Sequence, residues 1–75
     1  MTLNEAISKR IIMLCHDRGI TIEQLTEKVN ADPHAVMAVV KGHRQDTPLD
    51  LMGEICFTLG VTMSEFFHHS LFEGF

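Results

Sequence analysis

Residues 21–42, TIEQLTEKVNADPHAVMAVVKG, carry two helix-start signals separated by a short turn. Thr21 and Gln24 form the pattern of a capping box, in which each side chain satisfies a backbone amide that the first helical turn leaves unpaired. Asp32 followed by Pro33 is a second start, because Asp accepts a hydrogen bond from an early amide and Pro at the first helical position loses none. The pattern predicts two short helices joined by a tight turn, the arrangement called helix-turn-helix.

Similar signals recur on both sides of this unit. Capping boxes occupy residues 2–5 and 62–65, and Thr47 with Pro48 places a proline at another first helical position. Glycine ends many helices in the left-handed conformation. The expected helices span residues 3–18, 22–29, 33–41, 48–59 and 63–69, and glycines 19, 42 and 60 end three of them.

Apolar spacing supports a helical protein. Ile7, Ile11 and Leu14 repeat at the helical period, and no alternating run bounded by hairpin turns predicts a strand. The fold class is therefore all-α. With 75 residues and no internal linker, the chain is expected to form a single domain over residues 1–75. A domain this small buries only about 60% of its unfolded surface, so a partner chain would add stability.

The chain resembles a known family in three runs of sequence. They are residues 21–42, residues 10–15 (RIIMLC) and residues 55–67 (ICFTLGVTMSEFF). Their order and spacing are similar to those of Cro/repressor-type (XRE-family) helix-turn-helix regulators, which have a lambda-repressor-like DNA-binding domain. The resemblance implies a five-helix bundle whose third helix enters the major groove of double-stranded DNA. It also implies that the N-termini of the second and fourth helices touch phosphates, and that a two-fold homodimer binds a palindromic operator.

Three positions depart from the family pattern. Ile22 stands where relatives often have a Gln on a phosphate, and Leu51 lies near the place of a phosphate-binding Thr. Val40 stands where they often have a Glu that pairs with the arginine aligned with Arg10, so Arg10 needs another partner or lies in solvent. The departures leave the fold intact but remove contacts on which DNA binding in the family often relies.

The expected third helix has one face that can reach base edges. Val36 and Val39 define its buried side at 100° per residue. His34 offers a directional hydrogen bond, whereas apolar side chains there can contact a thymine methyl group. This predicts modest specificity, biased to T-rich positions and helped by DNA shape. The candidate base contacts are Pro33, His34, Met37 and Ala38.

Basic and capping residues around this helix are the candidate phosphate contacts. Residues 41–44 form a basic cluster just after it, and any one of these side chains could equally be a solvated surface charge. Each phosphate that a protein neutralises adds about 0.9 to the salt dependence of binding. The candidates are Thr21, Lys28, Lys41, His43, Arg44 and Thr47.

The C-terminal segment, residues 66–75, holds four of the five phenylalanines. An exposed aromatic tail is an aggregation hazard, so it is expected to fold onto the core or to cover a partner. The residues assigned to a tail or dimer role are Phe66, Phe67, Leu71, Phe72 and Phe75. The pattern leaves open whether they cap the core or form the dimer interface.

Other classes of function find no support. Adjacent Cys15-His16 and His68-His69 pairs cannot share a metal ion, and no phosphate-binding Gly loop or nucleophile motif occurs. Cys15 and Cys56 lie in apolar surroundings, as buried free thiols do. We expect no enzyme activity, metal, cofactor or small-molecule ligand. No membrane segment or signal peptide is evident, so the expected location is the cytoplasm.

The sequence therefore predicts a sequence-specific DNA-binding transcriptional regulator, acting as a repressor. The net charge of −4 and the apolar face of the third helix keep a second hypothesis open. In that alternative, a helix-turn-helix scaffold has lost DNA reading and acts as a protein-interaction or dimerisation module.

Overall fold

The computed structural model describes residues 1–44 and 46–74. Its helices are α1 (Leu3–Arg18), α2 (Ile22–Lys28), α3 (Pro33–Val40), α4 (Leu49–Leu59) and α5 (Met63–Phe67), followed by a 3-10 turn, η1 (Ser70–Phe72). The described residues contain no strand, so the predicted all-α class with five helices is confirmed. None of these helices has the length and apolar character needed to cross a membrane.

Three capping boxes start helices as predicted. At α1 the Glu5 amide donates to the Thr2 hydroxyl at 3.1 Å, and the Thr2 amide donates to the Glu5 carboxylate at 3.0 Å. Thr21 and Thr62 start α2 and α5 with the same reciprocal pair of bonds. The backbone hydrogen bond from Thr2 lowers the pKa of Glu5, and the bond from Thr62 does the same to Glu65. Both caps therefore strengthen the helix starts while these carboxylates are ionised.

Several predicted helix boundaries are wrong by one or two residues. α4 begins at Leu49, because Pro48 has an extended ψ of 143° and acts as the N-cap without a side-chain bond. The prediction that Thr47 caps this helix is therefore wrong. α2 and α3 each end one residue early, at Lys28 and Val40. α5 ends at Phe67 because His68, with ψ 77°, has left the helical conformation.

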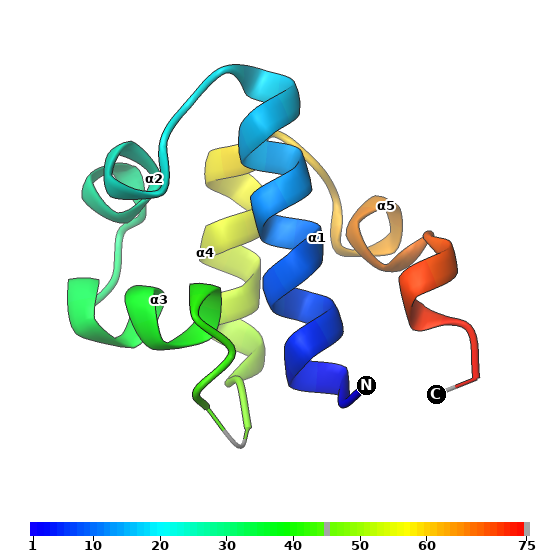
Figure 1. Cartoon of the computed structure of the whole chain (residues 1–75). Coiled ribbons are helices and arrows are strands. Elements are labelled where there is room, and N and C mark those ends of the chain that lie inside the picture. The colour runs from blue at the N-terminus through cyan, green and yellow to red at the C-terminus, as the bar shows by residue number, and fades with distance from the viewer. Residues whose placement is uncertain (45, 75) are drawn as a thin grey trace.

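The helix α1 is the central element of the fold. It contacts α2, α3, α4 and η1, and Figure 1 shows it crossing the middle of the molecule, with α2 and α3 on one side and α5 on the other. The core is a continuous apolar cluster to which every α-helix contributes. Its largest fully buried side chains are Ile11, Leu25, Val36, Ile55 and Phe66.

Polar side chains of α1 bond to the ends of three other helices. The buried Ser8 hydroxyl donates to the Val40 carbonyl at the end of α3. Arg10 donates to two carbonyls at the end of α5, at 2.8 Å to Phe66 and 3.1 Å to Glu65. Arg18 donates to the Leu59 carbonyl, the last residue of α4, at 2.7 Å. These bonds satisfy carbonyls that have no partner within their own helix, and they show where Arg10 finds its partner.

The C-terminal segment packs on the core of its own chain. Phe66 is fully buried, and its ring centroid lies 4.9 Å from that of Phe67 in an edge-to-face pair. Phe72 of η1 lies at the same distance from Phe67 and packs against the core cluster. Leu71 is half-buried, whereas Phe75 lies outside the described residues. Phe66 is therefore a core residue and is not available to a partner.

Replacing Arg10 by Met tests the link between α1 and α5. The change keeps much of the aliphatic stem but removes the donors to Phe66 and Glu65, and hydrogen bonds to charged groups contribute about 1.5–3 kcal/mol. We expect the free energy of unfolding to fall by that amount in urea titrations followed by circular dichroism. Lys9→Met, at the neighbouring exposed position, is the matched control and should change stability little. Equal losses in the two variants would show that the Arg10 bonds contribute nothing.

Candidate nucleic-acid interface

The start of α3 is fixed by Asp32. Its carboxylate accepts the His34 amide at 3.0 Å, and Pro33 occupies the first helical position. Val36, Val39 and Val40 bury one side of the helix against the core. Since the buried stripe determines which side faces outward, the sequence of α3 sets the orientation of the exposed residues.

The four predicted base-contacting residues lie on the outer side of α3. Pro33 and His34 are exposed, whereas Met37 and Ala38 are half-buried. The His34 side chain is 99% exposed, and its Nδ1 lies 3.5 Å from the Asp32 carboxylate. The leading end of this face therefore carries a carboxylate beside the one side chain that offers a directional bond to a base edge.

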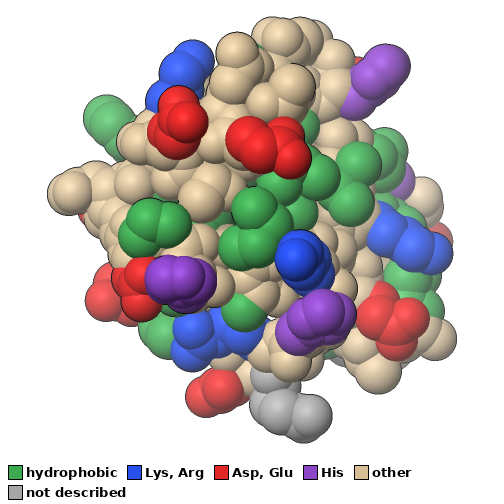
Figure 2. Space-filling model, turned by 60° about the vertical axis from the view of Figure 1, so that its left-hand side comes forward, with side chains coloured by type: hydrophobic (Ala, Val, Ile, Leu, Met, Phe, Trp, Pro, Cys, Tyr) green, Lys and Arg blue, Asp and Glu red, His purple; other side chains and the backbone are tan. Residues whose placement is uncertain are grey.

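An apolar groove of 510 Å³ lies between α1, α2 and α3, and of the four predicted base-contacting residues Met37 lines it. Figure 2 shows the side of the molecule that bears α2 and α3, where apolar side chains gather in the middle and charged ones and His surround them. Lys41, His43 and Glu23 supply the ionisable side chains of the groove. Its other lining residues are Ser8, Ile12, Ile22, Met37 and Val40.

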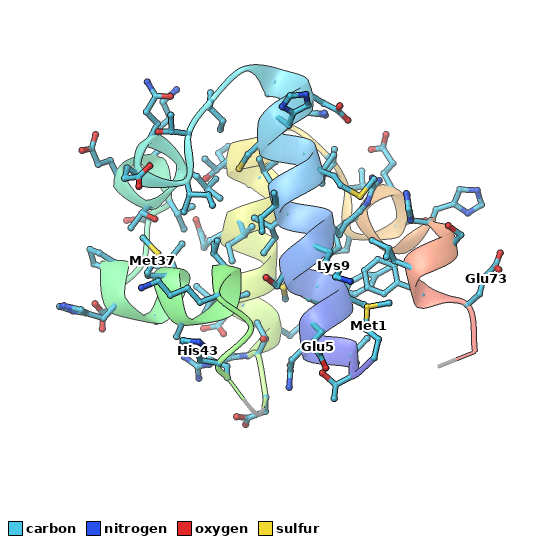
Figure 3. All side chains as sticks on the ribbon, viewed as in Figure 1. Met1, Glu5, Lys9, Met37, His43 and Glu73 are labelled. Carbon is cyan, nitrogen blue, oxygen red and sulfur yellow. The ribbon has the colours of Figure 1, made fainter. Side chains whose placement is uncertain are left out.

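The predicted phosphate-contacting Lys, Arg and His residues lie near α3 but differ in exposure. Lys28, Lys41 and His43 are exposed, and Figure 3 shows His43 just beyond the end of the helix that bears Met37. Arg44 is half-buried, and its Nε donates to the Asp46 carbonyl at 2.9 Å. Gly42, with φ 72°, turns the chain between Lys41 and His43 in a conformation that L side chains rarely adopt.

The two threonines predicted to touch phosphates differ in role. The Thr21 amide donates to the Gln24 side chain at 2.8 Å, and the Thr21 hydroxyl accepts the Gln24 amide at 3.1 Å. A hydroxyl group also has an O–H donor, which can turn toward a phosphate. Thr47 stands before the Pro48 cap and makes no cap of its own, so the predicted capped amide at Thr47 is not formed.

Comparison with protein families agrees with this geometry. The family model of the Cro/C1-type HTH DNA-binding domain matches residues 10–70. The chain belongs to the Cro/C1-type helix-turn-helix family. The match covers all of α2 to α5 and most of α1. Searches of curated proteins and of solved structures gave no match.

This Cro/C1-type domain has few cations to offer to DNA. The chain has six Lys and Arg residues in all, against ten Asp and Glu. Arg10 and Arg18 are bonded to helix carbonyls within the fold. Lys28 and Lys41 are the two lysines on the helix-turn-helix unit itself. Electrostatic attraction to phosphates therefore depends on a small local cluster and not on the net charge.

The groove contains three residues that the sequence pattern did not assign to it, namely Ile12 of α1 and Ile22 and Glu23 of α2. Ile12 is 45% exposed and lines the groove with Met37. It lies off the Ile7, Ile11 and Leu14 stripe, which is the signal that could have placed it outside the core. Ile22 stands at a position where relatives often have a phosphate-binding Gln, and Glu23 is the acidic residue in the first turn of α2. Ile12 and Ile22 make the groove apolar, and its lining carries one carboxylate, that of Glu23, together with Lys41 and His43.

Neither cysteine lies on the interface. Cys15 and Cys56 are both buried free thiols, as predicted, and burial raises the pKa of each. A raised pKa leaves less of the nucleophilic thiolate at neutral pH. Within the described part of the chain, no group of three or more His, Cys, Asp and Glu side chains could hold a metal ion.

The burial of both thiols predicts that they react slowly with thiol reagents in the native state. At pH 8, Ellman's reagent should label the folded protein far more slowly than the protein unfolded in urea, where two thiols per chain should react. A native thiol that reacted as fast as in urea would contradict the burial.

Proposed function

We propose that this Cro/C1-type domain is a transcriptional repressor that binds a palindromic double-stranded operator as a homodimer, with α3 in the major groove. The observation that carries the proposal is the outer side of α3. It exposes Pro33 and His34, half-exposes Met37 and Ala38, and is followed at once by the exposed side chains of Lys41 and His43. A small domain represses more readily than it activates, because occupying a promoter needs no contact with polymerase.

Base reading in this proposal is mainly apolar. Met37 and Ala38 occupy the middle of α3 and have no group that can hydrogen-bond strongly to a purine edge. Their natural targets are thymine methyl groups in the major groove. His34 adds one directional bond at the leading end of the helix. Specificity then comes from a few methyl contacts, one hydrogen bond and the shape of the DNA.

Phosphate binding in this proposal uses Lys41 and His43 after α3, Lys28 at the end of α2 and the Thr21 hydroxyl. Arg44 is also within the same connection, although its Nε already donates to Asp46. Glu23, in the first turn of α2, repels phosphate and so weakens the contact proposed for the Thr21 hydroxyl. Affinity should consequently be moderate and sensitive to salt.

The alternative is a protein-interaction module without DNA reading. The apolar groove with Glu23 and the net charge of −4 are the features in its favour. The family match speaks for DNA binding. Fluorescence anisotropy with the DNA upstream of its own gene, at two salt concentrations, separates the two functions. Binding that weakens with salt and resists random competitor DNA supports the repressor, whereas no binding at low salt leaves the interaction module.

The variant Lys41→Ala tests the phosphate contacts. It should weaken binding to all DNA sequences alike. It should also reduce the slope of log affinity against log salt by about 0.9 for each Lys41–phosphate contact that is lost. Lys9→Ala removes one exposed cation from α1, outside the helix-turn-helix unit, and serves as the control. If both variants reduced the slope equally, only the overall charge of the protein would matter.

Thymine-to-deoxyuridine replacement tests the apolar reading. Removing a methyl group that contacts Met37 should lower affinity about fourfold, because burying a group of this size contributes about 0.8 kcal/mol. In the Met37→Ser variant the same replacement should have little effect, which makes the pair a double-mutant cycle.

Two results would contradict this docking. One is an operator that the wild-type protein binds equally well after any of its thymines is replaced by deoxyuridine. The other is an unchanged sequence preference after His34, Met37 and Ala38 are all replaced by Ser.

A further inference from the structure

The outer side of α4 takes part neither in the core nor in the proposed DNA contacts. The opposite side of this helix is buried by Leu51, Met52, Ile55, Cys56 and Leu59. At about 100° per residue, the side that points away from these residues is the outer stripe of α4. Its members are Asp50, Gly53, Glu54 and Phe57. They are three or four residues apart, so they are neighbours on the helix surface.

Phe57 is the most exposed large apolar side chain of the described chain, at 83%. Its neighbours one turn away on the same side are Gly53, four residues before it, and Gly60, three residues after it. Because neither neighbour has a side chain, α4 itself does not cover the aromatic ring. Phenylalanine is enriched at the centres of protein interfaces, where its large apolar area is buried by a partner.

Gly53 is not explained by the fold. It lies within α4 and is not among the glycines with positive φ. A Cβ atom added there would meet no packed atom within 4 Å. Glycine inside a helix destabilises it relative to alanine, and it allows another chain to approach the backbone closely. The outer stripe therefore has a notch between Asp50 and Phe57, at the expense of helix stability.

Asp50 and Glu54 give the outer stripe a negative charge that the fold does not neutralise. α4 carries no lysine or arginine. Among the described residues, the one ion pair joins His34 to Asp32. One carboxylate oxygen of Asp50 accepts the Leu51 amide at 3.0 Å, a local bond that leaves the charge in place. The stripe therefore attracts a partner of positive charge.

This charge distinguishes between the possible partners. DNA and anionic membranes carry negative charge and are repelled. A second copy of the chain, in two-fold contact at Phe57, would bring four carboxylates together, because Asp50 and Glu54 lie on the stripe of each copy. Like charges in contact destabilise an interface. A basic protein segment has the complementary charge, and its lysine or arginine can also stack on an exposed Phe ring.

We propose that the outer stripe of α4 binds an amphipathic helix of another protein, whose facing side carries lysine or arginine beside a strip of small apolar residues. Phe57 packs against that strip, and the basic side chains pair with Asp50 and Glu54. The distance between two packed helices depends on the side chains at their contact, so Gly53 lets the axes approach. No residue of the stripe lines the groove beside α3. The inference therefore does not depend on the proposed DNA binding.

The test begins with a display library of helical peptides whose facing positions are Lys, Arg, Glu, Ala or Leu, selected on the immobilised full chain. We expect the enriched peptides to carry more Lys and Arg than Glu. The best of them is then titrated into the isotope-labelled protein and followed by nuclear magnetic resonance. The amide signals of residues 50–57 should shift, and added salt should weaken the binding.

Phe57→Ser should lower the affinity for this peptide about tenfold or more, as the loss of an interface anchor does. Two controls remove exposed apolar side chains elsewhere. Ile12 lines the groove beside α3, whereas Leu3 and Leu49 line a second apolar groove, of 360 Å³, between α1, α4 and α5. Ile12 and Leu3 are each 45% exposed. Ile12→Ser and Leu3→Ser should leave the affinity unchanged.

Gly53→Ala separates binding from stability. Alanine favours the helix, so the melting temperature should rise by about 4–8 °C. The added methyl group should nevertheless lower the affinity for the peptide about tenfold, because it prevents the close approach of the second helix.

Several outcomes overturn the proposal. They are a selection that enriches no peptide or enriches Glu over Lys and Arg, an affinity that Phe57→Ser leaves unchanged, and an affinity that Ile12→Ser or Leu3→Ser lowers as much as Phe57→Ser does. A Gly53→Ala variant that is more stable and binds the peptide as well as the wild-type protein also overturns it. Operator binding is measured separately, so its absence would refute the proposed function and leave this surface standing.

Discussion

Hydrogen bonds from α1 to the C-terminal carbonyls of other helices hold this domain together. Ser8 bonds to the end of α3, Arg10 to the end of α5, and Arg18 to the end of α4. The last carbonyls of a helix find no amide donor within that helix, and a carbonyl that is buried without a hydrogen bond lowers the stability of the fold. A positive guanidinium is also favourable at the negative end of a helix dipole. One helix thus fixes the ends of three others around an apolar core that is small for a stable domain.

Because Arg10 and Arg18 bond to helix carbonyls, few basic side chains remain for binding phosphates. Of the six Lys and Arg side chains, Arg10 and Arg18 bond to helix carbonyls within the fold. Lys28 and Lys41 lie on the helix-turn-helix unit, and Arg44, just after it, already donates to the Asp46 carbonyl. The outer side of α3 in turn is rich in apolar groups, with Met37 beside the groove that Ile12 and Ile22 line. A Cro/C1-type domain of this composition is expected to depend on methyl contacts and DNA shape more than on charge.

The two apolar grooves differ in the charged side chains that line them. The α3 face is edged by cations, and its proposed binding to DNA weakens as salt rises. The groove between α1, α4 and α5 has Asp46 as the one ionisable residue among the described residues that line it. Because the surfaces share no residue, a change in one can be made without altering the other.

The sequence by itself determined the helices, the capping boxes of three of them and the exposed side of α3. Capping boxes at Thr2, Thr21 and Thr62 and the valine stripe of α3 depend on neighbours a few residues away, so local patterns suffice. The start of α4 was misplaced because Pro48 fits either the first helical position or the cap before it. Only the tertiary structure decided where Arg10 and Arg18 bond, that Phe66 belongs to the core, and that Ile12 and Leu49 line separate grooves. These features join residues that are tens of positions apart, and the relative placement of helices, which local sequence does not encode, brings them together.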